Sequence, residues 1–312
     1  MMRMSKRILA LTMVVSLSMA ALAGCGDKEK KKENEIGGKD SVFTIAYAPN
    51  ESTDQSSDAR NGLAKDLGKY LGCEVEEIQA SDYNAIIEAL RTGKADMAYM
   101  GANAIALGYE KAGIEPITMK AEDGDPKKAV YQSYLITSAS NNKINSMKDI
   151  KGCTIAFVDP DSTSGNLVPT SDIITAFPDE KLNSDKLHTN GEFFEAASYS
   201  GSHQAGLQAV IRGDVDIVPI SNQILESEIA NGNAKESDVK IIHKSDTIPA
   251  EAMVVSPDIS DEIRAKLVKF LVAYDNQAYF TEVIKKENAR FIKCSIEDYK
   301  SVITLNKVLN GE

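Results

Sequence analysis

Three hydroxyl side chains and a glycine follow one another at Ser162, Thr163, Ser164 and Gly165, between a strand-like run and a helix-like run that contains Pro169. Proline fits the first turn of a helix, where the N–H that it lacks has no intrahelical partner. Hydroxyls and backbone N–H groups at a helix N-terminus favour a negatively charged ligand, and Gly165 allows an oxygen to approach the backbone closely. The stretch therefore predicts an anion site, with a plain Ser/Thr helix cap as the alternative.

A second helix start follows Gly201, with Ser202 as the expected N-cap of a helix that runs to Arg212. His203 falls in the first turn of this helix. From there its side chain can reach a ligand that the neighbouring loop holds. A structural or exposed histidine is the alternative interpretation.

These candidate residues belong to two halves that repeat each other. Residues 44–47 precede Ser52 and Thr53 in the same way that residues 154–157 precede Ser162 and Thr163, and residues 89–98 parallel residues 209–218. Each half reads strand, hydroxyl-rich loop, helix, strand, helix, glycine turn, strand, which is typical of parallel α/β units. Ligands in such sheets bind beyond the carboxyl ends of the strands, where Tyr99 and Ser221 also fall.

Helical periodicity supports two of the expected helices. Leucines recur at helical spacing before Gly72, and a second apolar face precedes Gly93. The residues are Leu63, Leu67 and Leu71 in the first helix, and Tyr83, Ile86, Ile87 and Leu90 in the second.

Two further strands are expected to connect the halves. Residues 131–136 lead out of the first half, and residues 251–255 lead back into it, followed by a helical segment at 263–279. This predicts a first lobe built from residues 42–137 plus 249–312, with a second lobe of residues 138–248 inserted between them. Two segments that cross side by side form a hinge, which permits closure around a ligand.

The N-terminus predicts export and anchoring. Arg3, Lys6 and Arg7 precede an apolar run that is short for a membrane span and ends in Leu-Ala-Gly-Cys at Cys25. Residues 1–24 are therefore interpreted as a signal peptide, since the ending resembles the lipobox of bacterial lipoproteins, in which the cysteine is lipidated. We expect residues 25–41 to form a flexible tether. The protein is then held by Cys25 on the extracytoplasmic face of the cell membrane.

The charge balance limits the possible partners. Removing the three basic residues of the signal from a total of 35 leaves 32 against 46 acidic residues, a formal charge of −14. This argues against nucleic acid, which requires a basic face. A small anion stays compatible, because local donors can outweigh a diffuse field. We expect a monomer.

Three stretches carry a family resemblance: FVDPDSTSGNLVP, GSHQAGLQAVIRGDVD and DYNAIIEALRTGKADMAYMG. They resemble the phosphate/phosphite/phosphonate-binding proteins of ABC importers, over nearly all of the chain after the tether. The resemblance implies a type II periplasmic-binding-protein fold that delivers a tetrahedral phosphorus oxyanion to a membrane permease. By the family pattern, the P–O oxygens are held by Ser162, Thr163, Ser164 and His203, while Tyr47 and Tyr99 wall the pocket from the first lobe.

The chain departs from that family pattern at two places. Gly101 is followed by alanine instead of the usual proline, and the loop at residues 219–223 lacks the carboxylates that pair with a ligand ammonium in aminoalkylphosphonate binders. Asp246 and Glu251, on the return crossing, are alternative partners for an ammonium. Because Ser221 and Asn222 occupy the loop, we expect a small uncharged substituent on phosphorus.

A Ser/His-dependent hydrolase of phosphate or acyl esters is the alternative function, with Ser164 as nucleophile and His203 as base. A nucleophile elbow requires Gly-x-Ser-x-Gly, and Ser162 occupies the first glycine position. Neither a Walker loop nor a dinucleotide fingerprint is present, and the cysteines show no metal-ligand spacing. We therefore expect no cofactor, no metal and no catalysis. A lipid-anchored sensor or adhesin is a third possibility, for which the sequence offers no positive feature.

Overall fold

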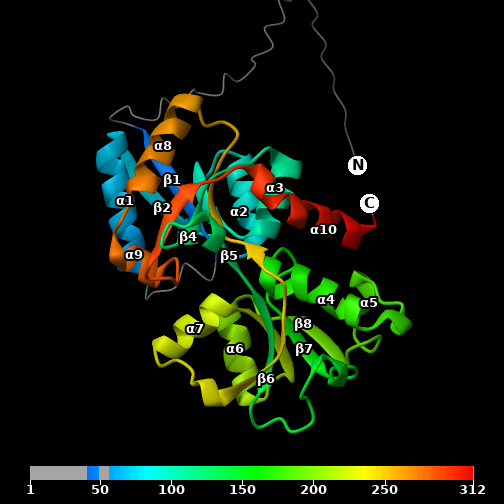
Figure 1. Ribbon diagram of the computed structural model, residues 1–312. Helices are drawn as coiled ribbons and strands as arrows, with labels where there is room; N and C mark the ends of the chain where they lie inside the picture. Colours follow the sequence, from blue (N-terminus) through cyan, green and yellow to red (C-terminus); the bar gives the residue numbers. More distant parts are fainter. Residues whose placement is uncertain (1–40, 49–55, 312) are drawn as a thin grey trace, which may run out of the picture. The chain divides into compact units, whose positions relative to one another are not determined.

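The computed structural model describes residues 41–48 and 56–311. Within these residues the strands form a six-stranded sheet, a five-stranded sheet and a two-stranded ribbon (Figure 1). Buried apolar clusters line both faces of each larger sheet, so each sheet is the centre of a separate α/β lobe. This confirms the predicted α/β class with two lobes.

The sheet of the first lobe has the strand order β2-β1-β3-β12-β4-β13. Strand β1 pairs in parallel with β2 and β3, whereas β12 is antiparallel to both β3 and β4. The strands are β1 (Val42–Tyr47), β2 (Glu74–Gln79), β3 (Met97–Met100), β4 (Glu115–Glu122), β12 (Ala252–Val255) and β13 (Ala289–Lys293).

The sheet of the second lobe has the matching order β8-β7-β9-β6-β10. Strand β7 pairs in parallel with β8 and β9, and β6 is antiparallel to β9 and β10. The strands are β6 (Ser133–Ser138), β7 (Thr154–Phe157), β8 (Ala196–Tyr199), β9 (Ile217–Ser221) and β10 (Val239–Lys244). The internal repeat predicted from the sequence is confirmed in this topology.

The two-stranded ribbon connects the lobes. Strand β5 (Val130–Tyr131) runs antiparallel to β11 (Ile248–Pro249), and Figure 1 shows the two connecting segments side by side. The two crossing strands expected from the sequence are therefore present. Because β6 already pairs within the second sheet, the outward crossing ends before Ser133, a few residues earlier than the predicted break after residue 137.

Helices cover both faces of the first sheet (Figure 1). One face carries α1, α8 and α9, and the other carries α2, α3 and α10. Their bounds are α1 (Ser57–Leu71), α2 (Tyr83–Arg91), α3 (Ala102–Ala112), α8 (Asp261–Ala273), α9 (Gln277–Glu282) and α10 (Lys300–Asn310). Gly72 caps α1 with a left-handed φ of 79°, as its position after the leucine repeat predicts.

The second sheet is covered by α4 and α5 on one face and by α6 and α7 on the other. Their bounds are α4 (Val168–Ala176), α5 (Ser184–His188), α6 (His203–Arg212) and α7 (Asn222–Ala230). The predicted start of α6 is confirmed, because the Ser202 side chain accepts a hydrogen bond from the N–H of Ala205 at 3.2 Å.

The segment at 263–279 differs from the prediction of one helix. Helix α8 ends at Ala273, and Tyr274 is extended with a ψ of 126°. Asn276 then caps α9, since its side chain accepts hydrogen bonds from the N–H groups of Ala278 and Tyr279 at 3.1 and 3.4 Å. Asparagine competes with the helical backbone for these donors, which explains the break.

The predicted signal peptide, the lipidation site at Cys25 and residues 25–40 of the tether lie outside the described residues. Within residues 41–48 and 56–311, no helix combines the length and apolar character that crossing a membrane requires.

Candidate anion-binding site

The loop after β7 and the turn η4 (Thr163–Leu167) carry the hydroxyl cluster. The side chain of Ser162 accepts a hydrogen bond from the N–H of Gly165 at 3.1 Å, and its carbonyl accepts one from Leu167 at 3.0 Å. The π-type turn η4 continues into α4, whose first turn contains Pro169. A helical N-terminus at the hydroxyl cluster is thus confirmed, and it begins slightly before Gly165.

Gly165 has a packing role that the sequence did not suggest. The sequence interpretation counted the backbone N–H groups of this helix start among the donors for an anion. The N–H of Gly165 instead donates to the side chain of Ser162, so it does not face outward. A Cβ at this position would lie 2.4 Å from the Cβ of Val158 and 2.7 Å from the Ser162 hydroxyl. The absent side chain lets the turn pack directly on the end of β7.

His203 connects the hydroxyl cluster to the end of β9. Its Nε2 lies 3.3 Å from the Ser164 hydroxyl, and the N–H of Ser221 donates to its Nδ1 at 3.4 Å. Burial lowers the pKa of His203 to about 4, because desolvation disfavours the imidazolium. The ring is therefore neutral at physiological pH and offers one donor and one acceptor.

The N-terminus of α3 faces the cluster from the first lobe. The backbone N–H of Asn103 donates to the Thr163 hydroxyl at 2.8 Å, and its side-chain amide donates to the carbonyl of Asp161 at 3.1 Å. Gly101 caps α3, and a Cβ there would lie 3.2 Å from the Thr163 hydroxyl. Thr163 therefore connects the two lobes, and its hydroxyl lies at the N-terminus of α3, the positive end of the helix dipole.

A cavity of about 20 Å³ lies between these elements. Among the described residues, its lining includes neither lysine nor arginine, and it brings together the first residues of α2, η4 and α6. The lining residues are Ala48, Tyr83, Tyr99, Gly101, Tyr131, Ser162, Thr163, Ser164, His203, Ile224 and Glu251. Attraction for an anion must therefore come from hydroxyls, N–H groups and helix dipoles.

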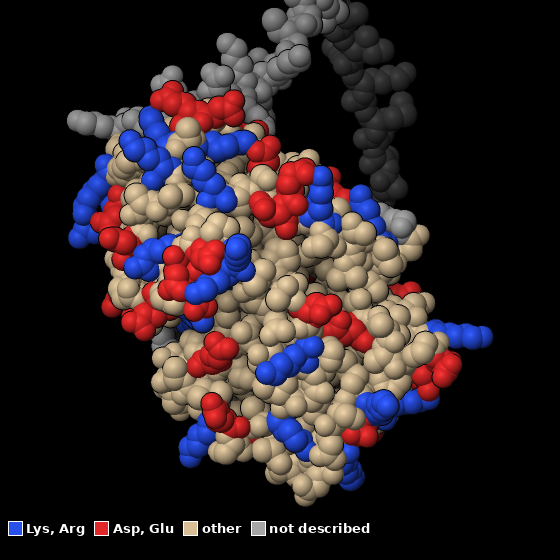
Figure 2. Space-filling view, viewed as in Figure 1, with Lys and Arg blue, Asp and Glu red and all other residues tan. Residues whose placement is uncertain are grey.

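The outer surface supplies no alternative source of attraction on the face shown in Figure 2. Lysine and arginine side chains are interspersed there with aspartate and glutamate, in a chain whose formal net charge is −11.

Some predicted site residues do not line the cavity. Tyr47 is fully buried on the sheet face that α1 and α9 cover, with its hydroxyl 3.2 Å from that of Tyr279. Ser221 is buried at the end of β9 and contacts His203 through its backbone. Ser52 and Thr53 lie outside the described residues. The ligand roles of all the predicted site residues stay predictions.

The segments at and next to the two crossings add Ser133 and Tyr131, which the sequence interpretation missed, whereas Glu251 was considered there as a partner for a ligand ammonium. The buried Ser133 hydroxyl donates to the carbonyl of Ser164 at 2.6 Å and so orients the hydroxyl loop. Tyr131 and Glu251 line the cavity from the two crossings. Asp246, the other carboxylate considered for an ammonium, is exposed and is not part of the lining. The antiparallel pairing of β6 with β9 could have indicated Ser133, because it places the start of β6 beside the end of β9.

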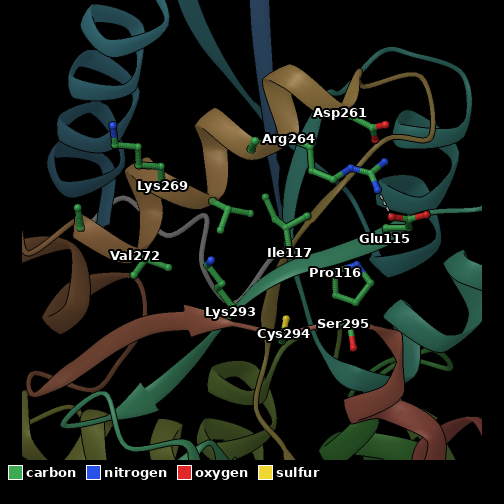
Figure 3. A pocket seen from close by; sticks show the side chains of 13 residues that line it. Glu115, Pro116, Ile117, Asp261, Arg264, Lys269, Val272, Lys293, Cys294 and Ser295 are labelled. Carbon is green, nitrogen blue, oxygen red and sulfur yellow. Dashed lines mark hydrogen bonds and ion pairs between the residues drawn. The ribbon is translucent and has the colours of Figure 1, made fainter.

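A larger hollow of about 750 Å³ lies in the first lobe between α8 and the strands β4 and β13 (Figure 3). Its floor is mainly apolar, with Pro116, Ile117 and Val272 among the side chains that line it. Burial raises the pKa of Cys294, which borders this hollow, to about 12, so its thiol is not a nucleophile at neutral pH. None of the predicted site residues that the structure describes lines this hollow.

The geometry around Ser164 does not favour the hydrolase alternative. A general base works best when its pKa lies near the operating pH, and His203, with a pKa of about 4, is a weak base. Among the described residues, no group of three or more His, Cys, Asp or Glu is placed to hold a metal ion. The arrangement can hold an anion by hydrogen bonds but offers little to activate a nucleophile.

Two α/β lobes, a double crossing and a polar cavity between the lobes define a solute-binding protein of the periplasmic type. The chain belongs to the family of periplasmic substrate-binding proteins of phosphonate ABC transporters. The model of this family matches residues 45–299 of the chain.

The chain is also similar to individual proteins. The phosphate-import protein PhnD of Mycolicibacterium smegmatis is 28% identical over 264 residues, covering 83% of this chain and 80% of that protein. A binding-protein component of an ABC phosphonate transporter from Pseudomonas aeruginosa has a TM-score of 0.74 at 24% identity, covering 86% of both chains. PhnD1 from Prochlorococcus marinus, in complex with methylphosphonate, has a TM-score of 0.73 at 20% identity, covering 86% of this chain and 98% of that one. These structural likenesses confirm the predicted type II fold.

Proposed function

We propose that this protein captures a phosphonate, phosphite or phosphate oxyanion between its lobes and delivers it to the permease of an ABC importer. The observation that carries the proposal is the convergence of Ser162, Thr163, Ser164 and His203 with the N-terminus of α3 around one cavity. Such a site holds a tetrahedral oxyanion by directional hydrogen bonds, without a cationic side chain in the lining. Family membership supports the same ligand class.

Ligand entry requires movement of the lobes. A cavity of about 20 Å³ has room for about one water molecule, which is less than a phosphorus oxyanion needs. Opening breaks the contact between Asn103 and Thr163 and frees that N–H and that hydroxyl for ligand oxygens. The ribbon of β5 and β11 is the hinge for this motion.

We test the function by calorimetry with phosphate, phosphite, methylphosphonate and aminoethylphosphonate, using sulfate as a tetrahedral anion without phosphorus. Saturable binding of at least one phosphorus compound, weakened in Thr163→Ala and His203→Ala, is the expected result. Unchanged affinity in both variants would exclude this cavity as the site. Turnover of phosphomonoesters that depends on Ser164 would favour the hydrolase instead.

The preferred ligand carries a small uncharged substituent on phosphorus. The β9–α7 junction, next to His203, contains Ser221 and Asn222 rather than carboxylates, and the Asn222 amide donates to Glu226 at 3.2 Å. Calorimetry that ranks aminoethylphosphonate well above phosphite and methylphosphonate would contradict this preference.

The cellular setting is part of the proposal. Cleavage before Cys25 and lipidation of that cysteine place a monomer on the extracytoplasmic face of the cell membrane, next to the permease. The support is the Leu-Ala-Gly-Cys sequence after an apolar run, together with a family that acts outside the cytoplasm.

A further inference from the structure

Among the described residues, Glu251 is the one acidic residue that lines the cavity. Its Oε2 lies 2.7 Å from the Nζ of Lys120, and the two side chains are only 14% and 5% exposed. This is a largely buried ion pair at the wall of a site that takes anions. Its position raises the question of what a carboxylate does there.

Lys120 is held in place from several sides. Its backbone N–H donates to the carbonyl of Glu251 at 3.1 Å, and its Nζ lies 5.8 Å from the centre of the Tyr131 ring, another cavity residue. The carbonyl of Ile284 lies 3.5 Å from the same Nζ. The ammonium is therefore fixed on the side of Glu251 that faces β4 and the hinge.

A carboxylate at this wall has two electrostatic consequences. Unpaired, it repels a bound oxyanion, and it attracts a cationic group on the substituent of the ligand. Paired with Lys120, its charge is compensated by an ammonium that belongs to the protein, through an ion pair and without a hydrogen bond to Oε2. We propose that Lys120 sets the charge of the ligand substituent, excluding an ammonium by neutralising Glu251.

Lys120 is thus a positioning residue that determines specificity through Glu251. This inference rests on the proposed function, because it assumes that a phosphorus oxyanion occupies the cavity. It differs from that proposal in naming the ion pair, and not the loop at Ser221, as the element that discriminates between substituents.

The test is the ratio of affinities for methylphosphonate and aminoethylphosphonate, measured by calorimetry at pH 7.5 on the full mature chain. In Lys120→Met the ratio is expected to move at least tenfold towards aminoethylphosphonate, because Glu251 becomes available to the ligand ammonium. The double variant Lys120→Met with Glu251→Gln is expected to lose that shift. Lys120→Arg, which keeps the charge, is expected to stay within about threefold of the wild-type ratio.

Stability is checked by thermal unfolding, because removing one partner of a buried ion pair is destabilising. If Lys120→Met does not fold, Glu251→Gln serves instead. It leaves a cation without its carboxylate and is expected to move the ratio at least tenfold towards methylphosphonate. A ratio within twofold of wild type in the folded variant overturns the inference while leaving the proposed function intact. Wild-type protein that binds neither compound, nor phosphite or phosphate, overturns the proposed function itself.

Discussion

Burial of His203 makes the stability of this protein sensitive to acid. Desolvation lowers the pKa of His203 from 6.5 to about 4. Between these two values the unfolded chain binds a proton that the folded imidazole does not, so stability falls as the pH falls through this window. Each pKa unit corresponds to about 1.4 kcal/mol, so the free energy of unfolding decreases by about 3 kcal/mol between pH 7 and pH 4 on account of His203 alone.

The substitution His203→Gln removes this contribution, because glutamine does not titrate. We expect the variant to lose about 3 kcal/mol less than wild type between pH 7 and pH 4, measured by urea unfolding at both values. Burial raises the pKa of Asp159 and Asp161, which opposes the effect of His203 because those carboxyls are easier to accommodate once protonated. Their contribution is shared by both proteins and cancels in the comparison.

His188 provides the matched control. Burial also lowers its pKa, and it lies outside the cavity, stacked on Tyr199 with a centroid distance of 5.9 Å. His188→Gln is expected to relieve a separate part of the acid sensitivity, which adds to the effect of His203→Gln. If wild type and His203→Gln lose the same free energy between pH 7 and pH 4, the folded imidazole is accessible to protons and the reasoning from burial is wrong.

Three further predictions concern binding, motion and anchoring. Thr163→Ala removes a hydroxyl that is expected to make a charge-assisted bond worth about 1.5–3 kcal/mol, so the dissociation constant measured by calorimetry should rise tenfold or more, whereas Thr163→Ser should recover most of the loss. An unchanged constant in the alanine variant would remove Thr163 from the site. Saturating ligand should change the radius of gyration measured by solution scattering and raise the melting temperature with concentration, and identical scattering profiles would reject hinge motion about β5 and β11. Cys25→Ser should move the protein from the membrane fraction to the soluble fraction, and a variant that stays in the membrane with its signal processed normally would contradict lipidation.

Local signals explain why much of the fold followed from the sequence. Gly72 and Gly213 end helices with φ values of 79° and 76°, a backbone conformation that glycine adopts without a steric penalty. Ser162 and Ser202 cap the two helical segments that the hydroxyl loop and His203 begin. These features depend on residues within one turn of each other, so the sequence alone reveals them.

The contacts between distant segments could not be predicted in this way. Asn103 and Thr163 are 60 residues apart, and Lys120 and Glu251 come from the two segments of the first lobe on either side of the inserted second lobe. Tyr47 shows a related limit, because alternation along β1 predicts that neighbours face opposite sides but not which side meets the ligand. The sequence interpretation singled out Gly165 for the approach of a ligand oxygen, whereas the structure shows a different need for glycine, the closeness of Val158, which depends on packing.

The repeated topology explains why the hinge and the site are close together. In each lobe, the strand that arrives from the other lobe (β6 or β12) runs antiparallel to the last parallel strand (β9 or β3). It therefore starts beside the carboxyl end of that parallel strand, which is where ligands bind in such sheets. Ser133 lies opposite Ser221 in this way, and Ala252 lies opposite Met100. The residues at the starts of β6 and β12 differ in chemistry. Ser133 donates a hydrogen bond to the hydroxyl loop, whereas Glu251, just before Ala252, forms an ion pair with Lys120. Rotation about β5 and β11 must therefore shift the wall of the cavity relative to its hydroxyl loop. Under the proposed function, a ligand that contacts both is sensitive to the hinge angle, and closure would be driven by its differential affinity for the open and closed arrangements.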